Sequence, residues 1–385
     1  MEIQKCPNCN SDLIEDAWEE LGHKANGDVI LDSYPAWICK NRCGYIRRLE
    51  VQTENAAALE QIVCTVDHKY SNPKIPNLFH FATSELSQDA FLCWLISWAD
   101  RSLESVNQPM HGTANEFIKM VLKKFHLPIV DVETIEIKRQ FKGLDILVII
   151  NDRFAMLIED KTFTKNHSNQ LTRYRQAVEK GYPELVQLPI YYKIADQSHY
   201  KSVIESGFIP FTRHDILELT EKGRSIGANH PLFLDYAEHI RDIEARIQAY
   251  QTKPVEDWDS YAWQGFYMEL QKHFVGNWGY VPNQAGGFWG MWWDYKRNTN
   301  YFIVLEEKKL CLKIRVKPDE HKATARNKAL EEMLSESEKH DLHLERPARM
   351  GSGLTMTVAQ RTNYIQVNVD GIVNILGTVA ELKKY

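Results

Sequence analysis

The sequence predicts a mixed α/β protein with a small cysteine-rich unit at its N-terminus and an α+β unit at its C-terminus. Three observations predict this organisation. Four cysteines near the N-terminus form two closely spaced pairs. Between residues 77 and 222, apolar residues recur at helical spacing and then in continuous or alternating runs that are typical of strands. Residues 258–385 hold a second set of helix and strand patterns.

The composition is that of a globular protein with more than one core. The chain has 385 residues, of which 44% are hydrophobic and 25% charged, and this length favours two or three domains. No apolar run approaches the roughly 20 residues of a membrane helix, and none follows the first charged residues as in a signal peptide. We therefore expect a cytoplasmic protein with no membrane partner.

The charge leaves nucleic-acid binding open. The net charge is −6, which argues mildly against a nucleic-acid binder because such proteins often carry a basic excess. Residues 296–328, however, hold ten Lys and Arg against four Asp and Glu. This basic strip fits either a local surface for a phosphate backbone or an ordinary solvated face.

The two cysteine pairs predict a structural zinc site in residues 1–50. Two residues separate Cys6 from Cys9, and three separate Cys39 from Cys43. In a reducing compartment such pairs bind metal more often than they form disulfides, and four thiolates suit tetrahedral Zn²⁺. The pattern resembles a zinc ribbon with an inserted loop, because 29 residues lie between the two pairs. A redox-active cysteine pair is the alternative.

The middle of the chain, residues 77–222, is expected to place helices before a sheet. Helical spacing predicts helices over Glu85–Ser105 and Asn115–Phe125, with a chain break at His111-Gly112 between them. A further helix is expected at Ser168–Gly181. Strands are expected at Ile129–Ile137, Leu144–Ile150, Phe154–Lys161, Leu188–Ile194 and Phe208–Thr212. This order is typical of a mixed sheet flanked by helices.

The C-terminal part is expected to follow a helical linker over residues 223–257 that includes a helix at Pro231–Gln251. Strands are expected around the aromatic run 286–293 and at 301–306, 310–316 and 354–360, with helices at 258–274, 322–336 and 369–383. The aromatic run fits either a buried core strand or a surface that stacks on nucleic-acid bases.

The residues whose side chains could take part in catalysis or metal binding lie on two strands of the middle part. A turn at Asn151-Asp-Arg153 sets a register in which Asp145 lies across from Glu159. Because side chains alternate between the faces of a strand, Glu159 and Lys161 share one face and Asp160 points to the other. Two carboxylates and a lysine are therefore expected to converge on one patch of the sheet.

This patch predicts a site for a divalent cation. Two neighbouring carboxylates repel each other unless a cation lies between them, and oxygen ligands on a rigid sheet suit Mg²⁺ or Mn²⁺. A Lewis acid, an activated water and a nearby cation are what phosphodiester hydrolysis needs. The alternative is an exposed Glu–Lys pair, but a lone Asp145 at the start of a buried strand would be costly.

Four segments in this order resemble the PD-(D/E)XK nuclease superfamily. Asp145 and, on the next strand, Glu159-Asp160-Lys161 resemble its signature. Asn77–Trp94 is similar to the helical motif of a bacterial branch that occurs in anti-phage defence, and Gln170–Tyr174 is similar to the motif on the helix after the second strand. The resemblance covers about residues 77–215.

The resemblance implies a restriction-endonuclease-like sheet and a Mg²⁺-dependent endonuclease (or one that uses Mn²⁺) acting on DNA or on RNA. It implies that Asp145, Glu159 and the backbone carbonyl of Asp160 bind the catalytic ion. Partners would be the nucleic acid and either a second copy of the chain or another protein of a defence system.

The resemblance also implies roles for three further residues. Lys161 would activate the attacking water, Glu85 would supplement the metal shell, and Gln170 would orient the lysine or a phosphate. The alternatives are a helix N-terminal acid for Glu85 and an exposed helix amide for Gln170. For the whole chain, the alternative functions are a non-cleaving nucleic-acid-binding module and a protein-interaction module that uses the zinc ribbon.

Overall fold

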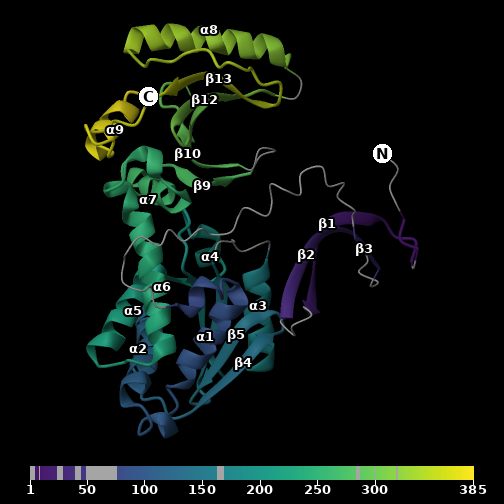
Figure 1. Ribbon diagram of the computed structural model, residues 1–385, viewed down its shortest axis with the longest axis vertical. Helices are drawn as coiled ribbons and strands as arrows, with labels where there is room; N and C mark the ends of the chain where they lie inside the picture. Colours follow the sequence, from purple (N-terminus) through teal and green to yellow (C-terminus); the bar gives the residue numbers. More distant parts are fainter. Residues whose placement is uncertain are drawn as a thin grey trace. The chain divides into compact units, whose positions relative to one another are not determined.

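The computed structural model describes residues 5–7, 9–23, 29–39, 45–48, 76–162, 169–282, 287–298, 300–317 and 320–385. The chain divides into two compact units, residues 1–74 and residues 75–385. Figure 1 shows the helices and strands of both units. Among the helices of the described residues, none combines the length and the apolar composition that crossing a bilayer requires.

The N-terminal unit contains a three-stranded antiparallel sheet. β1 (Leu13–His23) pairs with β2 (Val29–Cys39) along its whole length, and β2 pairs with β3 (Ile46–Arg48). The segment between Cys9 and Cys39, which the sequence suggested was an inserted loop, therefore consists largely of the β1–β2 hairpin.

The larger unit begins with a five-stranded mixed sheet in the order β4-β5-β6-β7-β8. Its strands are β4 (Ile135–Phe141), β5 (Leu144–Ile150), β6 (Phe154–Lys161), β7 (Val186–Lys193) and β8 (Ile209–Thr212). β4, β5 and β6 are antiparallel, whereas β7 and β8 run parallel to β6. The predicted mixed sheet is confirmed, and β5 and β6 begin and end where the sequence predicts.

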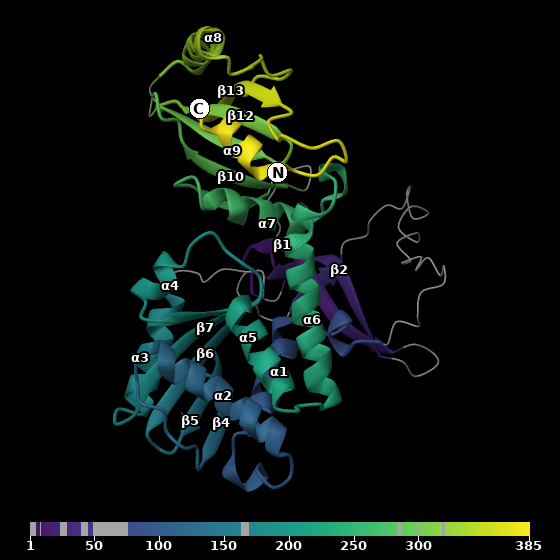
Figure 2. The same cartoon turned by 90° about the vertical axis from the view of Figure 1, so that its left-hand side faces the viewer.

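Helices cover both faces of this sheet (Figure 2). One face packs against α1 (Glu85–Ser97), α2 (Gln108–Lys124), α5 (Arg213–Ser225) and α6 (Pro231–Gln248), and the other against α3 (Gln170–Gly181) and α4 (Lys201–Glu205). In β5, Ile146 and Val148 join the first core, while Leu147 and Ile149 join the second. Burial on both faces explains why this strand is almost wholly apolar.

Two expectations about the first helices are wrong. α1 ends at Ser97 rather than Ser105, and a 3₁₀ turn follows it. His111-Gly112 does not break the chain, because both residues lie inside α2. The start of α2 is fixed earlier, where the Asn107 side chain accepts a hydrogen bond from the Met110 backbone and Pro109 occupies the first turn. An Asn cap followed by proline is a strong helix start.

The C-terminal part of the larger unit contains an antiparallel sheet in the order β13-β12-β11-β10-β9. Its strands are β9 (Asn277–Val281), β10 (Phe288–Asp294), β11 (Tyr301–Glu306), β12 (Lys309–Arg315) and β13 (Thr355–Thr362). Its helices are α7 (Ser260–Gln271), α8 (Lys322–His340) and α9 (Ile375–Leu382). Buried residues of all three helices share one hydrophobic core with the sheet.

A buried arginine fastens α6 to the mixed sheet. Arg213, at the start of α5, is only 4% exposed. Its guanidinium bonds Asp196 after β7 and, at 2.7 Å, Glu244 on α6, and it donates to the Ile194 carbonyl at 3.1 Å. One cation therefore satisfies acceptors from two separate segments around it.

Arg213→Ala should lower the free energy of unfolding by about 3–5 kcal/mol, because it leaves two carboxylates without their buried counter-ion. Arg101→Ala is the matched control, since Arg101 pairs with Glu133 where both side chains are more than half exposed, and such pairs contribute about 1 kcal/mol or less. Urea denaturation followed by circular dichroism measures both changes. Equal losses for the two variants would contradict the role given to Arg213.

Candidate functional site

The predicted site residues meet where β5 begins and β6 ends. Ile146 pairs with Ile158 across the two strands, and this is the register that the turn at residues 151–153 predicted. One step further out, Asp145 and Glu159 therefore lie opposite each other. Both side chains point to the face that α3 covers, because Leu147 and Leu157, two residues away on each strand, belong to the core on that face.

Lys161 lies at the centre of an acidic cluster. Its ammonium Nζ is 2.8 Å from Glu159 Oε1, 3.6 Å from Glu85 Oε2 and 3.9 Å from Asp145 Oδ2. It also donates to the Asp160 backbone carbonyl at 2.8 Å. The lysine side chain is 10% exposed and that of Glu159 only 1%. One buried cation thus faces three carboxylates that come from three different elements.

Backbone groups hold two of these carboxylates in place. The Asp160 amide donates to Asp145 Oδ2 at 2.9 Å, and the Thr162 amide donates to Glu85 Oε1 at 3.1 Å. Glu85 is the first residue of α1, where the helix dipole favours a negative charge, and Ser84 caps that helix. The end of β6 therefore positions acids from both the neighbouring strand and the helix.

On the other side of the cluster, α3 contributes an amide. Gln170 Nε2 donates to Glu159 Oε1 at 2.9 Å and to the Tyr174 hydroxyl at 2.8 Å, so its contact is with Glu159 rather than with Lys161. The Tyr174 ring lies against Gly143, where an added Cβ would be 3.2 Å from the ring, and Gly143 has a φ of +91°. A side chain at that turn would displace Tyr174 and the amide that bonds it.

The charges in the cluster are not balanced. Burial and the charge of Asp145 raise the pKa of Glu159 to about 8. Burial alone would lower the pKa of Lys161, but the charges of Glu159, Asp145 and Glu85 more than offset it and raise that pKa. Glu159 Oε2 is buried and accepts no hydrogen bond from any donor in the described part of the chain. A second cation is what this arrangement lacks.

The residues present therefore fit a divalent cation. Asp145 and Glu159 offer carboxylate oxygens, one of which is buried and has no donor within the described segments, and the Asp160 carbonyl lies at the same end of the strand. Mg²⁺ and Mn²⁺ prefer such oxygen ligands. Asp145, Glu159, Lys161, Glu85 and Gln170 are brought together by the fold.

Behind the cluster, a polar network on the α1 face was not predicted. Asp160 Oδ1 accepts a hydrogen bond from Gln88 Nε2, Gln88 Oε1 accepts one from the Tyr236 hydroxyl of α6 at 3.3 Å, and Tyr236 bonds Tyr192 at 2.9 Å. Asp89 lies beside Asp160, and burial together with the charge of Asp145 raises the pKa of Asp89 to about 7.

The spacing from Glu85 was the signal that could have revealed Gln88 and Asp89. Residues three and four positions apart lie on one helix face, so the three side chains point towards the same end of the sheet. The network ties the strand residue Asp160 to both α1 and α6. It therefore fixes the backbone of β6 at the position where Asp160 presents its carbonyl.

Three of the four predicted zinc ligands also converge, in the N-terminal unit. The sulfur atoms of Cys6, Cys9 and Cys39 all lie within 4.8 Å of one another, and this group could hold a metal ion. The Cys9–Cys39 sulfur distance is 3.3 Å, too long for a disulfide bond. The Cys39 amide donates to the Tyr45 carbonyl at 3.2 Å. Cys43 lies outside the described residues.

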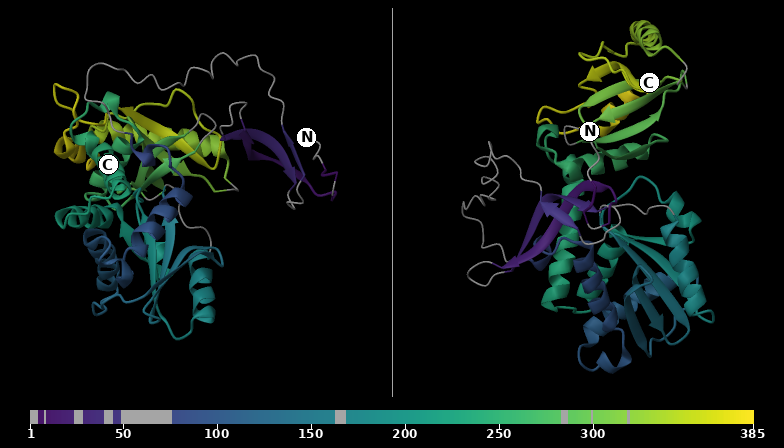
Figure 3. Two further views of the ribbon diagram at one scale, coloured as in Figure 1. Left: turned by 60° about the horizontal axis from the view of Figure 1, so that its bottom comes forward. Right: turned by 90° about the vertical axis from the view of Figure 1, so that its right-hand side faces the viewer.

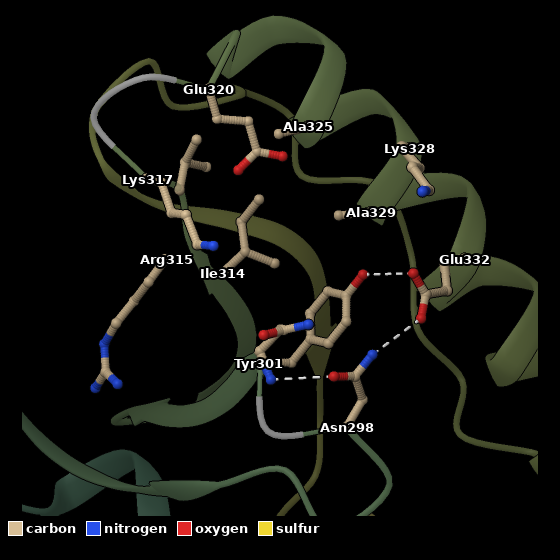
Figure 4. Close-up of a pocket in the computed structure, with 12 residues that line it drawn as sticks. Asn298, Tyr301, Ile314, Arg315, Lys317, Glu320, Ala325, Lys328, Ala329 and Glu332 are labelled. Atoms are coloured by element: carbon tan, nitrogen blue, oxygen red, sulfur yellow. Dashed lines mark hydrogen bonds between the residues drawn. The ribbon is translucent and has the colours of Figure 1, made fainter.

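A pocket of about 590 Å³ lies far along the chain from these residues, between β11, β12 and α8. Figure 4 shows that polar side chains lining the pocket bond one another, because Tyr301 and Asn298 both donate to Glu332. None of the predicted site residues lines it. We assign it no part in the chemistry.

Comparison with known proteins gives one match. Residues 76–226 match the sequence profile of a family described as the PD-(D/E)XK nuclease superfamily. No curated protein and no solved structure matches the chain. The match covers α1 to α5 and so includes the whole acidic cluster, the mixed sheet is consistent with that superfamily's fold, and the match suggests a nuclease.

The polar network is expected to stabilise the folded protein, and substitution of Gln88 tests this. Gln88→Leu should lower the free energy of unfolding by about 1–3 kcal/mol, because Asp160 Oδ1 would lose a donor that water cannot replace at a buried position. Leu86→Ala, at a site 59% exposed in the same helix turn, should change stability by about 0.5 kcal/mol or less. Thermal and urea unfolding compare the two. If Gln88→Leu matches its control, the network does not hold β6.

Proposed function

We propose that the chain is a metal-dependent nuclease that hydrolyses phosphodiester bonds of DNA. The observation that carries this proposal is the cluster of three carboxylates around Lys161, with a buried Glu159 oxygen that accepts no hydrogen bond from the described residues. The superfamily match over residues 76–226 supports the same reaction class. Catalytic residues on rigid strands, held by backbone amides, suit chemistry that depends on positioning.

Asp145, Glu159 and the Asp160 carbonyl are the proposed ligands of Mg²⁺ or Mn²⁺. When bound, the ion would supply a Lewis acid and lower the pKa of a bound water. Glu85 would supplement this shell from α1. Gln170 would hold Glu159 in orientation through the hydrogen bond to its Oε1.

Lys161 would act on the water and on the phosphate. Its Nζ keeps its proton while it faces three carboxylates, because their charges raise its pKa. If those carboxylates also bound a divalent cation, their charges would raise the pKa of the Lys161 ammonium less. Nζ can then accept a proton from the attacking water, or remain a cation beside the charge that develops on the phosphate.

A structural zinc ion is proposed for the N-terminal unit, bound by Cys6, Cys9, Cys39 and Cys43. Three of these sulfur atoms already lie close enough for one ion, and thiolates are the ligands zinc prefers. Residues 1–50 would form this ribbon, 77–222 the nuclease domain, 223–257 the linker and 258–385 a C-terminal α+β domain.

The setting of the reaction is proposed from the resemblance alone. The similarity of residues 77–94 to a defence-type branch supports an endonuclease role in anti-phage defence in the bacterial cytoplasm. A second copy of the chain, or another protein of the defence system, would be its partner.

The metal and water roles predict that two substitutions fail in different ways. Lys161→Met should lose roughly 10²–10⁴-fold in cleavage but keep its affinity for Mn²⁺, since no carboxylate is removed. Asp145→Ala should lose metal binding and cleavage together, because too few anchoring oxygens remain. Calorimetric titration with Mn²⁺, alongside plasmid cleavage in Mg²⁺ or Mn²⁺, measures both properties.

Lys180→Met is the matched control for this pair, because the exposed Lys180 on α3 undergoes the same chemical change away from the cluster. It should cleave at the wild-type rate. Wild-type cleavage by Lys161→Met, or normal metal binding by Asp145→Ala, would refute the assigned roles. If the wild-type protein cleaves no nucleic acid with either ion, a non-cleaving binding module becomes the better account.

The zinc proposal predicts one bound Zn²⁺ per chain. Cys39→Ser should release it and unfold the N-terminal unit, because metal binding and folding are coupled in such sites. Cys93→Ser, which changes a half-buried cysteine of α1, should keep its zinc. Elemental analysis measures the metal content, and its failure to find zinc in the wild-type protein would contradict the proposal.

A further inference from the structure

The C-terminal sheet has two faces of different character. Tyr301, Ile303 and Leu305 of β11 point into the core shared with α7, α8 and α9. Phe302 and Val304, which alternate with them, do not belong to that core. Figure 2 shows α9 in front of the sheet, and the right-hand panel of Figure 3 shows the sheet from its other side. We call this other side the open face.

The register defines which side chains the open face carries. Trp292 of β10 pairs with Val304, and Phe302 pairs with Lys313. Side chains on one face repeat every second residue, so the open face carries two acidic side chains, Asp294 and Glu306, together with the following aromatic and basic ones: Phe288, Trp292, Phe302, Lys309, Lys313 and Arg315. Trp289 and Trp293, which alternate with them, pack against the core on the helix side.

Three partly exposed aromatic rings lie on the open face. Trp292 and Phe302 occupy diagonal positions on neighbouring strands, where side chains are about 7–8 Å apart. Phe288 lies over Gly290, because a Cβ on that glycine would be 3.1 Å from the Phe288 ring. Rings that pack neither into the core nor against a helix of the described residues remain available to a ligand.

Basic side chains border these rings. Lys313 and Lys309 lie 2.6 Å and 3.2 Å from Glu306, so two ammonium groups share one carboxylate. The Arg315 guanidinium lies 4.6 Å from the centre of the Phe302 ring, and Figure 4 shows it pointing away from the pocket on the helix side. The open face therefore combines aromatic rings with three basic side chains against two acidic ones, Asp294 and Glu306.

We propose that the open face binds single-stranded DNA. Bases stack on Trp292 and Phe302, and phosphates lie along Lys309, Lys313 and Arg315. Aromatic stacking requires bases whose π-faces are exposed, which a duplex does not offer. Arginine guanidinium planes also stack on bases, so the Arg315–Phe302 pair is itself part of the platform. The face thus holds a strand that is unpaired.

This inference deepens the proposed nuclease function and rests on it for the choice of DNA. It also explains together the two sequence features that each had two interpretations, the aromatic run 286–293 and the basic strip 296–328. The aromatic run 286–293 alternates, so that Trp289 and Trp293 belong to the core and Phe288 and Trp292 to the open face. The basic strip 296–328 contributes Lys309, Lys313 and Arg315 to the open face.

Fluorescence anisotropy with a labelled oligo-dT strand, with no Mg²⁺ or Mn²⁺ added so that no cleavage occurs, tests the proposal. Trp292→Ala should weaken binding by about tenfold or more, since stacking on one ring contributes that much, and Trp292→Phe should restore most of it. Arg315→Glu, at an exposed position, should weaken binding and make it less dependent on salt.

Two control variants change one aromatic and one basic residue on the helix side of the sheet. Tyr280→Ala removes an aromatic residue that is 52% exposed and whose ring contacts Trp289, and Lys328→Glu reverses a charge on α8. Both should bind oligo-dT like the wild-type chain. Circular dichroism verifies that each variant is folded. If Trp292→Ala does not fold, Arg315→Glu still tests the proposal.

Three results would overturn the proposal: wild-type affinity in both Trp292→Ala and Arg315→Glu, equal losses in the controls, or tighter binding of a duplex of the same length. Tighter binding of oligo-rU than of oligo-dT would overturn the choice of DNA. Because binding is measured without Mg²⁺ or Mn²⁺, a chain that binds oligo-dT but never cleaves would refute the nuclease function alone.

Discussion

The contact between Lys161 and three carboxylates is the interaction on which the rest of the site depends. Glu159 is almost fully buried, and burial together with the charge of Asp145 raises its pKa to about 8 even though the Lys161 ammonium lies beside it. Removing one partner of a buried ion pair leaves the other uncompensated, which is costly. A single lysine neutralises this acidic cluster only in part. The remaining acidic groups therefore lower the stability of the fold and favour the binding of a second cation.

The mixed sheet makes this concentration of charge tolerable. β5 and β6 are buried on both faces along their apolar length, and the charged residues occur only where β5 begins and β6 ends. There, the backbone amides of Asp160 and Thr162 donate to Asp145 and Glu85, and the Gln170 amide of α3 donates to Glu159. On the opposite face, Gln88 links Asp160 to Tyr236 of α6. Glu159 and the Gln88 contact of Asp160 therefore lie on opposite faces of β6.

Much of this site could be predicted from the sequence, because it depends on local patterns. Two continuous apolar runs joined by a tight turn define β5 and β6, and the turn fixes the register that brings Asp145 to Glu159. The start of α2 could not be predicted from His111-Gly112, because the Asn107 cap begins the helix earlier and both of those residues are helical. Gln88 and Asp89 depend on which face of α1 meets the sheet, which is a matter of tertiary packing. The aromatic run was ambiguous because its two faces differ, and only the pairing of β10 with β11 separates them.

The most direct test of the account is a crystal structure of the protein soaked with Mn²⁺, with the anomalous signal used to locate the ion. The account predicts one peak in contact with the carboxylates of Asp145 and Glu159 and the carbonyl of Asp160, with Glu159 Oε2 engaged and Lys161 Nζ drawn away from Glu159. A cluster that keeps the Lys161–Glu159 contact of 2.8 Å and shows no peak at saturating Mn²⁺ would contradict it.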